Sequence, residues 1–171
     1  MKKIALLLIA LTLVGGLAWS QESATPRGSV SMLLGGNVLA PIGVGVEFFF
    51  GNIGIVGELR GLFFGAEGNF VGTVEPGAYA RFYFSEPDSS LYLNGGVSYW
   101  TGWSSEDVAQ GGLVRPRAAV GYSALFGKDE RTRFHMELGG TWNLVAADGD
   151  IVEDFPALIL PYMHFDFGRA F

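Results

Sequence analysis

Two short patterns near the C-terminus combine a histidine with a carboxylate, His135-x-Glu137 and His164-x-Asp166. Imidazole nitrogens and carboxylate oxygens are ligands that Zn²⁺ accepts in tetrahedral protein sites. The same groups also form polar pairs when they are buried together. If the two segments are neighbouring antiparallel strands, His135 faces Asp166 and Glu137 faces His164. We expect polar pairing, with a zinc site as the alternative, and no cofactor.

Nucleophilic catalysis has little support in the sequence. The chain has no cysteine, and an activated serine needs a histidine beside it as its base. Ser104 and Ser105 have no histidine near them in the sequence, and neither histidine has a serine two positions away. We therefore expect that the protein is not an enzyme.

The elements that must position these residues are strands, because polar and apolar residues alternate over most of the chain. Met136 and Leu138, for example, alternate with His135 and Glu137. Only a strand places every second residue on one face. The 26 glycines among 171 residues also disfavour a helical bundle. The expected strands cover residues 28–35, 42–50, 53–64, 72–84, 91–102, 113–126, 133–145 and 157–171.

The composition indicates a small apolar β protein rather than an ordinary soluble domain. Hydrophobic residues make up 49% of the chain and charged residues only 16%, which is low for a surface in water. The net charge of −6 disfavours nucleic acid as a partner. Without cysteine the chain can form neither a disulfide framework nor a lipid-modified cysteine anchor.

The first 20 residues have the features of a secretory signal peptide. Lys2 and Lys3 precede an apolar stretch at 4–17, and small residues at 18 and 20 suit cleavage before Gln21. We expect residues 1–20 to be removed and residues 21–171 to form one barrel domain. No later segment has the 18 uninterrupted apolar residues of a candidate membrane helix.

Connections between the expected strands differ in length at the two ends of the sheet. Those after the second, fourth and sixth strands are tight, and we call their side the turn end; most of the others are longer, and we call theirs the loop end. Aromatic residues gather at both ends: Phe50, Phe84, Phe126, Phe134 and Phe171 at the turn end, and Phe63, Phe70, Tyr99, Trp103 and Trp142 at the loop end. This arrangement is typical of a transmembrane β-barrel. Such a sheet must close, because every backbone polar group in hydrocarbon needs a partner within the protein.

If the apolar face of each strand meets lipid, the opposite face lines the lumen. Carboxylates and arginines are then equally numerous inside, which favours cross-strand ion pairs and a plugged lumen. We expect Glu75 at the rim. The expected lumen network consists of Glu47, Glu58, Arg60, Arg81, Arg115, Arg117, His135, Glu137, His164 and Asp166.

The end of the chain resembles the terminal strand of bacterial outer-membrane proteins, which alternates outward apolar residues and finishes on phenylalanine. Phe165, Phe167 and Phe171 match that pattern, and Arg169 departs from it. The resemblance implies that these phenylalanines are part of the signal read by the barrel-assembly machinery. The chain after residue 20 resembles the small OmpA-, OmpX- and OmpW-type barrels, which implies a closed, eight-stranded, antiparallel up-and-down barrel.

We therefore expect an integral barrel in the outer membrane of a diderm bacterium, monomeric, with a structural or surface-interaction role. Its partners would be outer-membrane lipids, lipopolysaccharide and the assembly machinery. Acidic residues at 106–107 and 148–154 would bridge through divalent cations to lipopolysaccharide, receive a basic ligand or remain solvated.

Two alternatives remain open. One is a narrow channel for small or hydrophobic solutes. The other is a soluble, periplasmic, lipocalin-like ligand carrier, which has the same number of strands with the apolar face inward. Lysine is scarce after residue 20, where only Lys128 remains, and this disfavours a soluble outer face.

Overall fold

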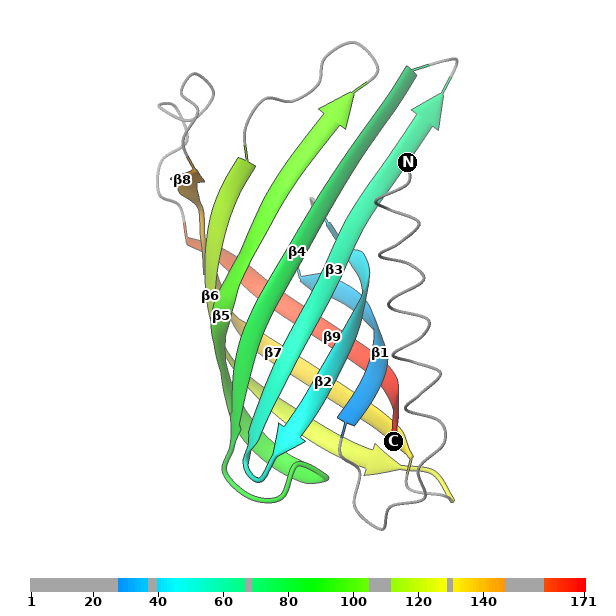
Figure 1. Ribbon diagram of the computed structural model, residues 1–171, viewed down its shortest axis with the longest axis vertical. Helices are drawn as coiled ribbons and strands as arrows, with labels where there is room; N and C mark the ends of the chain where they lie inside the picture. The colour runs from blue at the N-terminus through cyan, green and yellow to red at the C-terminus, as the bar shows by residue number, and fades with distance from the viewer. Residues whose placement is uncertain (1–27, 37–39, 67–68, 105–111, 129–130, 147–158) are drawn as a thin grey trace.

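The computed structural model describes residues 28–36, 40–66, 69–104, 112–128, 131–146 and 159–171. Within these ranges the chain is all-β (Figure 1). The strands are β1 (Gly28–Gly36), β2 (Ile42–Phe50), β3 (Ile53–Ala66), β4 (Asn69–Tyr83), β5 (Ser89–Ser104), β6 (Gly112–Phe126), β7 (Thr132–Trp142), β8 (Leu144–Ala146) and β9 (Ile159–Ala170). All eight expected strands are present, with ends that differ by a few residues.

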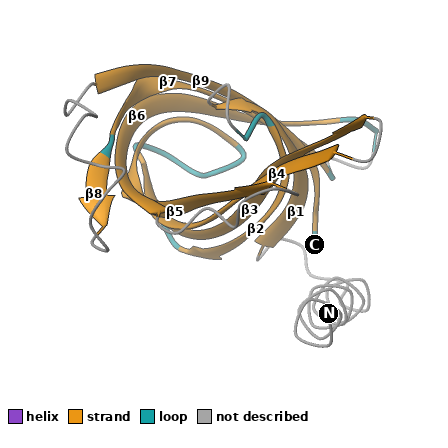
Figure 2. Cartoon of the chain, turned by 90° about the horizontal axis from the view of Figure 1, so that it is seen from above, coloured by secondary structure: helices purple, strands orange, loops and turns teal. Residues whose placement is uncertain are grey.

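The strands form a closed antiparallel barrel with up-and-down topology. Each strand from β1 to β6 pairs with the next, and β9 pairs with both β7 and β1. Backbone hydrogen bonds between Gly28 and Phe171 extend the β1–β9 seam to the last residue. Both β7 and β8 pair with β6, and β8 continues the line of β7. Counted together as one strand, they complete a ring of eight strands (Figure 2).

The expected strand at 133–145 is divided at Asn143. The pairing of β6 stops at Arg117 opposite Thr141 and resumes at Val114 opposite Leu144. Pro116 and Arg115 are the two β6 residues left unpaired between them, opposite Trp142 and Asn143. Proline has no backbone N–H to donate to a ladder. The interruption therefore has a cause on the neighbouring strand.

Tight connections lie at the turn end. Gly51 and Asn52 alone link β2 to β3, and Gly51 has a φ of 61°. Glycine adopts that left-handed conformation without a steric penalty, as two-residue hairpin turns require. Strands β3 to β6 have 14 to 16 residues whereas β1 and β2 have 9, so one side of the wall is taller at the loop end (Figure 1).

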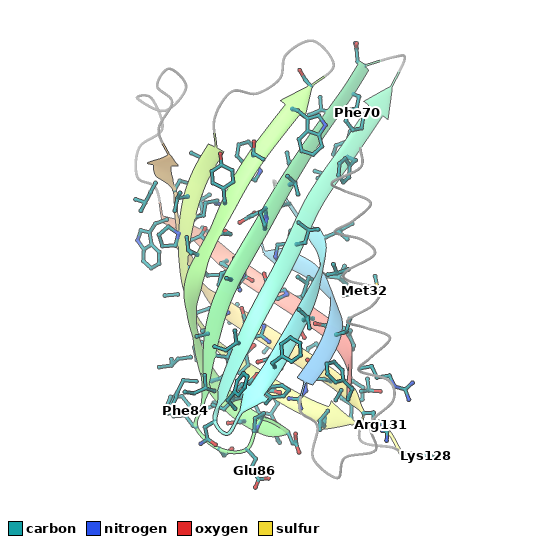
Figure 3. The ribbon with its side chains drawn as sticks, viewed as in Figure 1. Met32, Phe70, Phe84, Glu86, Lys128 and Arg131 are labelled. Carbon is teal, nitrogen blue, oxygen red and sulfur yellow. The ribbon has the colours of Figure 1, made fainter. Side chains whose placement is uncertain are left out.

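Most side chains divide by type between the two faces of the wall, although a few apolar residues such as Leu33 and Val56 are buried inside. Large apolar residues point outward and remain exposed, as Met32 on β1 (61% exposed) and Leu138 on β7 (51%) do. The interior instead contains charged residues and tyrosines, among them Tyr79, Tyr83 and Tyr92. Figure 3 shows Met32, Phe70 and Phe84 on the outer wall, with the charged Glu86, Lys128 and Arg131 gathered at the turn end. None of the described residues belongs to a helix long and apolar enough to cross a membrane.

Candidate functional site

The structure places all ten residues of the expected lumen network among the buried polar side chains. At their centre lies Arg81 on β4, which is 1% exposed. Its guanidinium forms ion pairs with three carboxylates from three other strands: Glu47 at 2.9 Å, Glu137 at 2.7 Å and Asp166 at 3.1 Å. Charge-assisted hydrogen bonds of this length are among the stronger polar contacts in proteins. We call this group the Arg81 cluster.

Both histidines attach to the Arg81 cluster through the expected register. His135 pairs with Asp166 across β7 and β9, and its Nδ1 lies 2.7 Å from the Asp166 Oδ1. Glu137 pairs with His164, whose Nδ1 lies 3.5 Å from the Glu137 Oε2. The Arg81 Nη1 lies 3.0 Å from the same Nδ1 of His135. The histidines are thus bound into the ion-pair network.

Three neutral side chains that the expected network omits also belong to the cluster. Tyr83 donates a hydrogen bond to the Glu47 Oε1 at 2.7 Å. Tyr92 and Asn94 donate to Glu137 at 3.0 and 2.9 Å. The signal for them was strand parity, because Tyr83 lies two residues from Arg81 and therefore on the same face.

A second group lies around Glu58 and joins opposite sides of the lumen. Glu58 accepts from Arg60 at 3.0 Å and from Arg117 at 3.1 Å. Both arginines also donate to the hydroxyl of Tyr162 on β9. The Arg117 guanidinium lies 3.5 Å from the ring centroid of Tyr79, a cation–π contact. The side chain of Arg117 comes within 3.9 Å of Glu137, which connects this group to the Arg81 cluster.

The expectation that Glu75 lies at the rim is wrong, because Glu75 is buried. It pairs with Arg115 at 3.1 Å and accepts a hydrogen bond from Ser98 at 2.6 Å. Arg115 also donates to Asn143 and Thr141. The tall strands β4 and β5 continue past this level, which keeps the pair inside the wall.

The buried charges of the described residues balance. Five arginines face five carboxylates: Arg60, Arg81, Arg115, Arg117 and Arg133 with Glu47, Glu58, Glu75, Glu137 and Asp166. Burying an unpaired charge is costly, and pairing with hydrogen bonds offsets that cost. The network can therefore fill the interior and cross-link the wall.

The zinc alternative finds no support in this geometry. In the part of the chain that the structure describes, no group of three or more histidine, cysteine, aspartate or glutamate side chains is arranged to hold a metal ion. Arg81 lies between the carboxylates and contacts His135 as well, so a cation already occupies the centre. The expected signal peptide at 1–20 and the acidic residues at 106–107 and 148–154 lie outside the described residues.

Exposed and half-buried aromatic rings form groups at both ends of the wall. At the loop end, Phe63, Phe70 and Trp103 have ring centroids 5.7 to 6.4 Å apart. At the turn end, the ring of Phe134 lies 4.8 Å from that of Phe167. The rings of Phe165 and Phe171 contact Phe134 and Phe48 respectively.

Known proteins give no further assignment: no family model matches the chain, and no curated protein or solved structure is significantly similar to it.

Proposed function

We propose that the protein is an integral outer-membrane β-barrel with a closed, polar lumen and a structural or surface-interaction role without catalysis. The observation that carries this proposal is the distribution of side chains, which is the reverse of that in a soluble protein: charged residues lie inside and large apolar residues lie outside. Among the charged residues of the described strands, Arg169 alone is exposed, and it lies next to the last residue of β9. The other charged side chains on these strands are buried inside the barrel.

The size of the uncharged outer wall suits a bilayer. A 15-residue strand such as β6, rising about 3.3 Å per residue and tilted about 40°, spans about 35 Å along the barrel axis. Outer-membrane barrels present an apolar band about 25 Å tall with aromatic girdles above and below it. The outward residues of β6, which include Val120 and Tyr122, carry no charge, and aromatic groups lie at both ends of the wall.

The same distribution argues against the soluble carrier. A lipocalin-like barrel encloses its ligand in an interior apolar cavity and needs a polar outer face. Here the interior contains ion pairs linked across the lumen, and the outer face would expose apolar side chains to water all around the ring. An exposed apolar patch of more than a few hundred Å² is rare on a soluble monomer.

Replacing Leu138 by arginine tests the membrane proposal. Leu138 lies in the middle of β7 and points outward, so an arginine there would destabilise a membrane-inserted barrel by about 2–4 kcal/mol. In water, an exposed substitution should change the free energy of unfolding by less than about 0.5 kcal/mol. The matched control is Ser89→Arg, which adds the same charge on the outer face where β5 begins at the turn end.

The measurement is urea titration of the protein in lipid vesicles, with folded and unfolded forms separated by their gel mobility without heating. A near-zero effect of Leu138→Arg, or recovery of the wild-type protein from the soluble fraction of cells, would contradict the proposal.

Conductance in planar bilayers tests the closed lumen separately from membrane insertion. The ion pair of Arg117 with Glu58 joins β6 to β3, and Arg115 links Glu75 on β4 to Thr141 on β7. Because these side chains fill the interior, we expect no single-channel steps. Reproducible steps that change when Arg115 or Arg117 is replaced would establish the narrow channel instead.

A further inference from the structure

The connection between β4 and β5 differs from the other described turns. Gly51, Asn52, Gly127 and Lys128 are all exposed, as expected of links that project into solvent. Residues 85–88, in contrast, bend beneath the barrel, and their last two members are half-buried. Viewed along the barrel, this segment lies inside the ring of strands (Figure 2). We call residues 85–88 the strap.

Hydrogen bonds attach the strap to β6, the neighbour of β5. The Ser123 hydroxyl donates to the backbone oxygen of Pro87 at 2.6 Å, and the backbone N–H of Leu125 donates to the backbone oxygen of Asp88 at 2.7 Å. Ser123 has no exposed surface, although it lies only three residues from the end of β6. The strap therefore covers the inner surface of the wall at this level.

Arg133 on β7, the strand that pairs with β6, holds the strap as well, and it lies opposite Leu125 in the register. Its guanidinium donates to the Pro87 backbone oxygen at 2.8 Å and to the Asp88 carboxylate at 3.1 Å. The same group lies 4.5 Å from the ring centroid of Phe49 on β2. Arg133 is the second residue of its strand, yet it is only 1% exposed. One side chain thus connects β7, β2 and the strap across the turn-end opening.

We propose that the strap and Arg133 form a lid that seals the turn end of the lumen independently of the ion-pair network above it. This inference goes beyond the proposed function, because it applies whether the wall meets lipid or water. The lid keeps water from the Arg81 cluster, where exclusion of solvent strengthens every ion pair. The chemistry that holds it is one buried guanidinium, two backbone oxygens and the carboxylate of Asp88.

Cysteine labelling tests the lid, since the natural chain contains no cysteine. Ser123→Cys places a thiol directly behind the strap, and Ser98→Cys places one at the level of Glu75 near the other end. The protein isolated from cells is treated with a water-soluble maleimide, and each thiol's labelling rate is compared with that in urea.

We expect Arg133→Ala to raise the labelling rate at position 123 by at least about tenfold, because local opening exposes the thiol. The rate at position 98 should stay unchanged. Lys128→Ala, which removes an exposed charge at the same end, is the matched control and should have no effect at either position.

Asp88→Asn provides a second variant that leaves the wall intact if Arg133→Ala does not fold. It removes the ion pair between Arg133 and the strap, and we expect a smaller increase at position 123. The lid is refuted if the thiol at 123 reacts as quickly in the folded protein as in urea, or if neither variant changes its rate. Equal acceleration at positions 123 and 98 would also refute it, because the barrel would then open as a whole. A protein that proves soluble would refute the membrane proposal and leave this test unaffected.

Discussion

Replacing Arg81 by methionine would show whether the buried charges act as one unit. Methionine is unbranched and uncharged and replaces only the aliphatic part of arginine. The variant therefore leaves Glu47, Glu137 and Asp166 without the guanidinium that all three contact at 2.7 to 3.1 Å. Every member of the cluster is almost fully buried, so water cannot replace the lost partner without opening the wall.

The expected magnitude follows from the number of pairs that the variant breaks. Removing one partner of a single buried ion pair typically costs about 3–5 kcal/mol. Arg81 serves three carboxylates, which would also repel one another once it is gone. We therefore expect Arg81→Met to lower the free energy of unfolding by at least about 4 kcal/mol.

Neutralising the carboxylates should reverse most of this loss. Adding Glu47→Gln, Glu137→Gln and Asp166→Asn to Arg81→Met removes the uncompensated charges and keeps side chains that can accept the hydrogen bonds of Tyr83 and Tyr92. Most of the cost of breaking a buried ion pair comes from the uncompensated charge that is left behind, and the combined variant leaves none of these three. The combined variant should therefore be more stable than Arg81→Met alone.

The assay is urea unfolding at neutral pH in lipid vesicles, followed by tryptophan fluorescence and by gel mobility. Glu86→Gln is the matched control, because it changes an exposed charge at the turn end and should shift the free energy of unfolding by less than about 0.5 kcal/mol. An Arg81→Met variant as stable as the wild type would refute the reasoning. So would a combined variant less stable than Arg81→Met.

Two further predictions concern packing and assembly. Gly121→Val should destabilise the barrel by about 1–3 kcal/mol, because a Cβ at Gly121 would clash with the ring of Tyr92. Gly95→Ala should be tolerated, because its Cβ would meet nothing closer than 3.9 Å. The midpoints of urea unfolding compare the two variants. Phe171→Ala should lose the edge-to-face contact with Phe48, worth about 1 kcal/mol in refolded protein. If Phe171 belongs to the assembly signal, the amount of assembled barrel in cells should fall far more than this loss of stability explains. A cellular amount that falls no further than the loss of stability explains would refute that role.

Strand parity made the larger part of the fold predictable. A period of two fixes which face each residue takes, and a closed sheet gives those faces only two environments. The pairings of His135 with Asp166 and of Glu137 with His164 followed from the same regularity. Local pattern therefore located the inner residues before their contacts were known.

Features that depend on distant residues could not be predicted in this way. Arg133 shares the parity of His135, but its contact with the strap joins residues 46 positions apart, which no local pattern indicates. The strap has no periodicity from which its path could be inferred. The break at Asn143 depends on Pro116 of another strand, and the burial of Glu75 depends on the height of the wall around it.

The contacts of the network also constrain how the barrel can form. Arg81 and Asp166 are 85 residues apart in the chain, and Arg60 and Tyr162 are 102 apart. Contacts between residues so distant in sequence require long loops to close before any interaction energy is gained. Until β1 meets β9, a partly formed sheet would carry charged residues on one face and apolar residues on the other. The charged residues would then lack ion-pair partners from distant strands. Closure of the β1–β9 seam is therefore the step at which the arginines and carboxylates become mutual partners, and we expect folding to be cooperative with few stable, partly closed intermediates.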